Sequence, residues 1–134
     1  LNLMKKRGVL NNELSKLIAE MGHKDKLIIS DAGLPIPEKT KRIDLALTRE
    51  IPHFIEVLNS VLEDLVVEKA IIAKEMKENS PKLYKKVEEM LDDIPIEFVS
   101  HDEFKKITEE SKGVVRSGEI IPFANIILIS GVDF

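Results

Sequence analysis

The sequence predicts an α/β fold, a three-layer α/β/α arrangement with a mostly parallel central sheet and helices on both sides. Short apolar runs of strand length alternate with runs of helical periodicity along the 134 residues. Several of the short runs, such as residues 27–29 and 126–129, are apolar at every position, which is typical of strands buried on both faces. The connections are short and the sequence contains no repeat or linker, so we expect one domain over residues 1–134.

The first half of the sequence holds two expected helices and three expected strands. Asn11 or Asn12 can cap a helix that Gly22 ends, because apolar residues between them recur at helical spacing. Thr48 and Pro52 open a second helix, along which an apolar stripe follows. The strands are short runs between turn signals, at residues 26–30, 43–47 and 68–73.

The second half continues this alternation of helices and strands. Pro81 is favoured at the first position of a helix, and two capping candidates, Asn79 and Ser80, precede it. Ser100 and Glu103 have the spacing of a capping box, which marks the start of the next helix. The remaining strands are expected at residues 94–99, 113–116 and 125–130.

Composition excludes several classes of function. The net charge is −4, the lysines mostly alternate with glutamates, and aromatic residues make up only 4%, so nucleic acid is not an expected partner. The absence of cysteine excludes disulfides and thiolate metal sites. No apolar run approaches the roughly 20 residues that a membrane-spanning helix needs, so we expect no membrane partner.

The start of the sequence lacks the apolar region of a secretory signal peptide. We therefore expect a cytoplasmic location. Met4 is the expected natural start, with residues 1–3 a remnant that precedes it.

His23 and Asp31 lie at the two ends of the strand expected at residues 26–30. An imidazole titrates near neutral pH and a nearby carboxylate can orient the ring, so this pair has the chemistry of a proton-transfer site. Two simpler interpretations stay open. His23 can offset the dipole at the end of the preceding helix, and Asp31 can bind a neighbouring backbone N–H in a turn.

Ligands of α/β sheets usually bind beyond the carboxyl ends of the strands, a position shared by Asp31, Glu75, His101 and Arg116. A neutral His101 in the first turn of a helix can donate and accept hydrogen bonds, which suits hydroxyl recognition; alternatively it faces solvent. Phe123 offers a ring face and Asn125 an amide, which together can bind a sugar or simply form a loop before a strand.

No glycine-rich nucleotide motif, serine-nucleophile motif or H-E-x-x-H zinc motif occurs in the sequence. The three histidines, His23, His53 and His101, are far apart in sequence. We therefore expect no metal and no cofactor.

Seven segments, taken in order, resemble the D-ribose pyranase family. They are Val9-Leu10-Asn11, Gly22-His23, Asp31-Ala32-Gly33-Leu34-Pro35-Ile36-Pro37, Arg42-Ile43-Asp44-Leu45-Ala46-Leu47, Ser100-His101, Arg116-Ser117-Gly118-Glu119 and Pro122-Phe123-Ala124-Asn125-Ile126-Ile127-Leu128. The resemblance implies an RbsD-like fold and a cofactor-free isomerase that interconverts the β-pyranose and β-furanose forms of D-ribose. It also implies pentameric rings that can stack to decamers, with sites at subunit interfaces.

The resemblance also implies roles for single residues. His23 matches the family's catalytic acid, Asp31 its substrate-binding aspartate and His101 a second sugar-contacting histidine. Phe123, Ala124 and Asn125 match a Tyr-Ala-Asn segment that a neighbouring subunit contributes. On this basis His23 gives a proton to the ring oxygen, and Asp31 holds a hydroxyl and favours protonated His23. Phe123 keeps the ring of the family's tyrosine but lacks its hydroxyl, a loss of about 1–3 kcal/mol if that hydroxyl binds the sugar.

Two other functions remain as alternatives. The first is a mutarotase of the fucose class, which exchanges anomers without changing the ring size. The second is a non-catalytic ribose-binding protein that accompanies transport.

Overall fold

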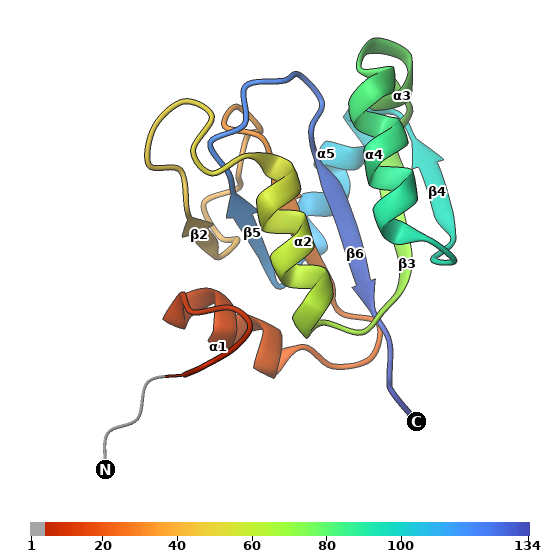
Figure 1. Ribbon diagram of the computed structural model, residues 1–134. Coiled ribbons are helices and arrows are strands. Elements are labelled where there is room, and N and C mark those ends of the chain that lie inside the picture. The colour runs from red at the N-terminus through yellow and green to blue at the C-terminus, as the bar shows by residue number, and fades with distance from the viewer. Residues whose placement is uncertain (1–4) are drawn as a thin grey trace.

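Residues 5–134, which the computed structural model describes, form six strands in one sheet with helices around it (Figure 1). The strands are β1 (Lys26–Ser30), β2 (Arg42–Asp44), β3 (Val67–Ala73), β4 (Ile96–Val99), β5 (Gly113–Arg116) and β6 (Ile126–Ser130). The helices are α1 (Asn12–Glu20), α2 (Phe54–Asp64), α3 (Lys74–Asn79), α4 (Pro81–Leu91) and α5 (His101–Ile107), which the 3₁₀ turn η1 (Thr108–Glu110) extends. Met4 and the residues before it lie outside the described part of the chain, and so does the expectation about the natural start.

The sheet is mostly parallel, as the sequence predicts. Its strand order is β2-β5-β1-β6-β3-β4. The pairs β2 with β5, β5 with β1 and β3 with β4 are parallel, whereas β6 runs antiparallel to both of its neighbours, β1 and β3. The last strand of the sequence therefore lies in the middle of the sheet and joins its two parallel halves.

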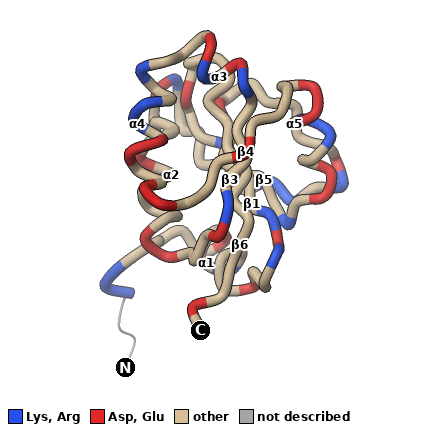
Figure 2. Tube along the Cα trace, turned by 90° about the vertical axis from the view of Figure 1, so that its right-hand side faces the viewer, with Lys and Arg blue, Asp and Glu red and all other residues tan. Residues whose placement is uncertain are grey.

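The three layers predicted from the sequence are visible when the sheet is viewed edge-on (Figure 2). Helices α1, α2, α3 and α4 cover one face and α5 covers the other. Side chains alternate between the two faces along β1, so Leu27 and Ile29 join the core beneath α2 while Ile28 joins the core beneath α5 and its Phe104. Burial of each such side chain contributes roughly 1.5–3 kcal/mol.

Two boundaries differ from the sequence-based expectation. β2 ends at Asp44, whose Oδ1 accepts a hydrogen bond from the N–H of Ala46, so the chain turns and Leu47 is left 80% exposed instead of continuing a strand. Thr48 lies in a turn that its pairing with Ile51 closes, and α2 begins only at Phe54. A further difference is α3, a separate helix before α4.

The direction of β6 determines which residues meet at one edge of the sheet. The parallel strands β1, β3, β4 and β5 all end at that edge, and β6 begins there because it runs the opposite way. Asp31 directly follows β1, Asn125 directly precedes β6, Arg116 is the last residue of β5, and His101 lies two residues after the end of β4. The opposite edge holds the residues that precede β1, including His23.

Candidate active site

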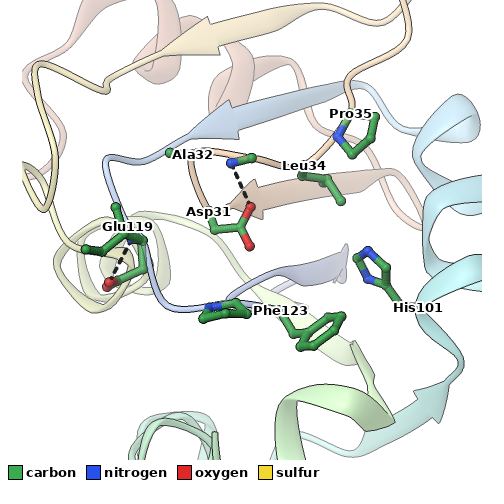
Figure 3. Close-up of a pocket in the computed structure, with 10 residues that line it drawn as sticks. Asp31, Ala32, Leu34, Pro35, His101, Glu119 and Phe123 are labelled. Atoms are coloured by element: carbon green, nitrogen blue, oxygen red, sulfur yellow. Dashed lines mark hydrogen bonds between the residues drawn. The ribbon is translucent and has the colours of Figure 1, made fainter. Parts of the chain in front are cut away.

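A cavity of about 450 Å³ opens at the edge of the sheet where β1, β4 and β5 end (Figure 3). Its lining consists of Asp31, Ala32, Gly33, Leu34, Pro35, His101, Glu119, Ile120, Pro122 and Phe123. The volume falls within the range of roughly 300–1,000 Å³ typical of small-molecule sites. The lining combines three titratable groups, Asp31, His101 and Glu119, with apolar surface, so the cavity is the candidate active site.

Hydrogen bonds with Gly33 and Asn125 hold Asp31 on the rim of the cavity. The N–H of Asp31 donates to Oδ1 of Asn125 at 2.8 Å, and its own Oδ1 accepts from the N–H of Gly33 at 3.0 Å. Burial raises the pKa of the Asp31 carboxyl above its ordinary value, while the N–H groups of Gly33 and Leu34 and the charge of His101 act in the opposite direction. The turn interpretation of Asp31 is thus correct for one oxygen, and the residue also faces the cavity.

Ala32, which follows Asp31, is held by hydrogen bonds at both its N–H and its carbonyl oxygen. The N–H of Ala32 donates to the backbone oxygen of Glu119 at 2.8 Å, and Nε of Arg116 donates to the backbone oxygen of Ala32 at 3.0 Å. The guanidinium of Arg116 is itself held by the carboxylate of Asp44 at 3.0 Å and 3.2 Å. These contacts hold the Asp31 turn in one conformation without help from a ligand.

His101 is the first residue of α5 and projects toward the cavity. Its backbone N–H donates to both carboxylate oxygens of Glu75, at 3.0 Å and 3.1 Å, and Oγ of Ser100 caps the helix by accepting from the N–H of Glu103 at 3.1 Å. The imidazole meets the ring of Phe123 edge-on, with 5.0 Å between the ring centroids. Its Nδ1 is buried and has no hydrogen-bond partner among the described residues, and the residue lines the cavity.

The segment from Phe123 to Asn125 divides its side chains between cavity and core. Phe123 lines the cavity, with its backbone at a positive φ of 63°. Ala124 is fully buried in the core, and its side chain is not part of the lining. Asn125 is 1% exposed; its Oδ1 holds Asp31, and its Nδ2 lacks a partner within residues 5–134.

His23 does not reach this cavity within one chain. It lies before β1, where its Nε2 is 3.2 Å from Oε2 of Glu68 and its side chain is 48% exposed. The five residues of β1 alone span about 16 Å between His23 and Asp31. The expectation of a His23–Asp31 pair in one subunit is therefore wrong, since a strand separates its two members.

A second correction concerns the segment from Phe123 to Asn125. The resemblance implied that a neighbouring subunit contributes it to the site. The structure instead places Phe123 beside His101 and Asn125 against Asp31 of the same chain, because antiparallel β6 begins at the edge where β1 ends. Asp31, His101 and Phe123 line the cavity, and Asn125 holds Asp31 from behind. Of the other two residues proposed for the site, Ala124 is buried in the core and His23 lies at the opposite edge of the sheet.

Sequence reasoning did not assign a role to Glu119, which is 3% exposed and lines the cavity. The signal that points to it is its isolation. Glu119 is the single charged residue in the apolar stretch between Arg116 and Asp133, and a carboxylate in such a place needs buried partners.

Two further features are absent from the described part of the chain. Within residues 5–134, no group of three or more histidine, aspartate or glutamate side chains is placed to hold a metal ion. None of the helices in the same range is long and apolar enough to cross a membrane.

The cavity presents groups that suit a small polyhydroxylated molecule. The carboxylate of Asp31 accepts hydrogen bonds from hydroxyl groups, and the unpartnered nitrogen of His101 adds a second polar contact. Phe123 provides an apolar surface for C–H groups.

Comparisons with known proteins agree with this chemistry. A sequence model of the RbsD / FucU transport protein family matches residues 4–133. The D-ribose pyranase of Coprothermobacter proteolyticus is 54% identical over 131 residues, covering 98% of this chain and 100% of that protein. The structure of Bacillus subtilis RbsD complexed with D-ribose superposes with a TM-score of 0.95 at 44% identity, covering 98% of this chain and 100% of that one. The fucose mutarotase of Streptococcus pneumoniae, solved in complex with L-fucose, shares the fold, with a TM-score of 0.80 at 24% identity and coverage of 91% and 93%.

Proposed function

This chain belongs to the RbsD / FucU family, and from that membership we propose that it is an isomerase that interconverts the β-pyranose and β-furanose forms of D-ribose. The observation that carries the proposal is the cavity itself, where a carboxylate, an unpartnered imidazole nitrogen and an aromatic face converge. The full-length identity of 54% to a protein named D-ribose pyranase supports ribose as the substrate.

The reaction needs only proton transfers. Cyclic ribose is a hemiacetal, so its ring opens when the anomeric hydroxyl loses a proton and the ring oxygen gains one. Closure through O4 instead of O5 then gives the furanose. General acid–base assistance to such transfers contributes typically about 10²- to 10⁴-fold, and neither a metal nor a nucleotide takes part.

In this proposal, the cavity residues bind the sugar. Asp31 accepts a hydrogen bond from a ribose hydroxyl, the imidazole of His101 contacts a second hydroxyl, and Phe123 covers a C–H face of the ring. The segment from Phe123 to Asn125 completes the binding site, with Asn125 holding Asp31 in place.

The proton donor in the proposal is His23 of a second copy of the chain. Because His23 lies at the opposite edge of the sheet, a copy that presents this edge to the cavity of its neighbour completes the site. Lys24 and His23 hold the pKa of Glu68 below its ordinary value, so Glu68 stays ionised and can orient the imidazole. Pentameric rings that stack to decamers are the assembly we propose, with the cytoplasm as the location and residues 1–134 as one domain.

Saturation-transfer NMR on D-ribose tests this function. The wild-type protein is expected to speed exchange between the pyranose and furanose signals, and His23→Ala is expected to lose that effect by about 10²-fold or more. Near-wild-type exchange by His23→Ala would remove His23 from the reaction. Binding of ribose with no change in exchange would favour the non-catalytic alternative.

The same measurement with L-fucose in place of ribose separates the proposed activity from the fucose-class alternative. We expect the protein to increase the rate of pyranose–furanose exchange of ribose more than the rate of anomer exchange of fucose. The reverse order would identify the chain as a mutarotase.

A further inference from the structure

We propose that Glu119 is a positioning residue that fixes the two walls of the ribose pocket relative to one another. The inference rests on the proposed function and deepens it. It concerns a buried carboxylate to which the proton transfers described above assign no part. Glu119 is 3% exposed and lies between the Asp31 turn and the loop that leads to Phe123 (Figure 3).

The carboxylate of Glu119 joins two separate segments of the chain. Its Oε2 accepts from the N–H groups of Ile120 and Ile121, at 3.1 Å and 3.3 Å, at the start of the loop. Its Oε1 accepts from the N–H of Phe54 at 3.2 Å, at the first residue of α2, and lies 3.3 Å from Nδ1 of His53. Both oxygens are thus occupied, and the loop is tied to the end of a helix.

The backbone of Glu119 connects the same point to the other wall. Its carbonyl oxygen accepts from the N–H of Ala32 at 2.8 Å, directly after Asp31. The wall that carries Asp31 and the wall that carries Phe123 therefore share Glu119 as a common support. A displacement of this residue would change the separation of the two groups that are to bind the sugar.

Other forces hold this loop only weakly. Ile120 and Ile121 are 45% and 38% exposed, so burial of their side chains contributes little to its conformation. Phe123 has a left-handed backbone that residues other than glycine adopt only at a cost, so its neighbours must maintain it. The hydrogen bonds to Glu119 fix the first two residues of the segment that leads to Phe123, and the N–H of Asn125 donates to the backbone oxygen of Phe123 at 2.9 Å.

Glu119→Gln tests the inference, since glutamine keeps the size but replaces one acceptor oxygen with an NH₂ group. The amide then faces backbone N–H donors on one side. We expect the KM for ribose exchange to rise about tenfold with kcat within about twofold, because misplaced walls weaken binding of substrate and transition state alike. Glu56→Gln is the matched control. Glu56 accepts from the N–H of His53 at 2.8 Å at the start of the same helix but does not line the pocket.

The outcomes distinguish this inference from the proposed function. If wild-type protein exchanges ribose and Glu119→Gln has a wild-type KM, the inference fails while the function stands. An equal rise in KM for Glu56→Gln would also overturn it, because the effect would then come from α2. If wild-type protein shows no exchange at all, the function itself fails.

A measurement on the wild-type protein covers the case in which Glu119→Gln does not fold. The amides of Ile120 and Ile121 are expected to exchange with solvent at least about a hundredfold more slowly than in an unstructured peptide, despite their exposed side chains. Unprotected amides would contradict a carboxylate that holds this loop.

Discussion

Asp31 carries a half-buried carboxyl group at the point where the sugar is proposed to bind. Burial raises the pKa of its carboxyl, so this group takes up a proton at a higher pH than an ordinary aspartate does. The protonated form is a poorer acceptor, and the KM for ribose is expected to rise as the pH falls, starting above the ordinary value of 3.8. Exchange kinetics measured across the acidic range would show this rise in KM. A KM that stays constant as the pH falls to 3.8 would contradict the expectation.

The same burial makes ionised Asp31 unfavourable for folding at neutral pH. Because the folded-state pKa is raised, the folded chain binds more protons than the unfolded chain between the unfolded and the folded pKa of Asp31. Stability therefore falls as the pH rises through the folded pKa and stays lower above it. Asp31→Asn is therefore expected to raise Tm at pH 7 while raising the KM by about 10- to 100-fold. Asp102→Asn, at an 88% exposed side chain on α5, is the control and should change neither.

Some residues of the candidate site could be predicted from the sequence, and others could not. Asp31 and His101 follow predicted strands, and the rule on strand ends was enough to single them out. The contact of Asn125 could not be foreseen, because its partner is a backbone N–H 94 residues away. His23 and Asp31 are close in sequence but lie at opposite ends of β1, so their separation in sequence gives no guide to their distance in space.

Helix α5 delivers His101, and its start depends on the Ser100 cap. Ser100→Ala removes the acceptor for the N–H of Glu103 and should lower the free energy of unfolding by about 1 kcal/mol. The KM for ribose should change less than about twofold, because Glu75 still holds the N–H of His101. Urea unfolding at fixed protein concentration measures the loss.

Ser60→Ala is the control for this cap. Its hydroxyl donates to the backbone oxygen of Glu56 within α2 and caps no helix, so a change within about 0.5 kcal/mol is expected. Equal losses for the two variants would mean that Ser100 contributes nothing as a cap.

The strands that the sequence predicted correctly are those whose ends are marked by turn residues. The strands at residues 26–30 and 113–116 match β1 and β5, because turn residues bound their apolar runs. The strand expected at residues 43–47 is wrong beyond Asp44, where a side chain that binds its own backbone outweighs the alternation of apolar residues. Leu47 shows that an apolar period alone does not prove burial.

The whole molecule has its proposed acid at one edge of the sheet and its binding groups at the other. If a second copy supplies His23, then at a ribose concentration near the wild-type KM both His23→Ala and Asp31→Asn should lose most of their exchange when alone, Asp31→Asn because of its raised KM. Co-expression in one assembly should restore exchange. With equal amounts of the two chains mixed at random, about a quarter of the sites contain an intact Asp31 from one copy and an intact His23 from the other. Saturation-transfer NMR on mixed assemblies, verified by native mass spectrometry, measures the recovery.

The control for this complementation is co-expression of His23→Ala with a chain that carries both substitutions. That mixture has no intact His23 and should stay inactive. The two single variants are then mixed in assemblies shown to contain both chains. If such a mixture exchanges ribose no faster than the single variants alone, the site is not shared.

The central place of β6 also bears on how the molecule is made. This strand comes last in the sequence, yet it alone links the half formed by β2, β5 and β1 to the half formed by β3 and β4. During synthesis the sheet can therefore be completed only after this strand has emerged from the ribosome and paired with both halves. Asn125 arrives with it, so the Asp31 turn receives its final support in the same event that closes the sheet.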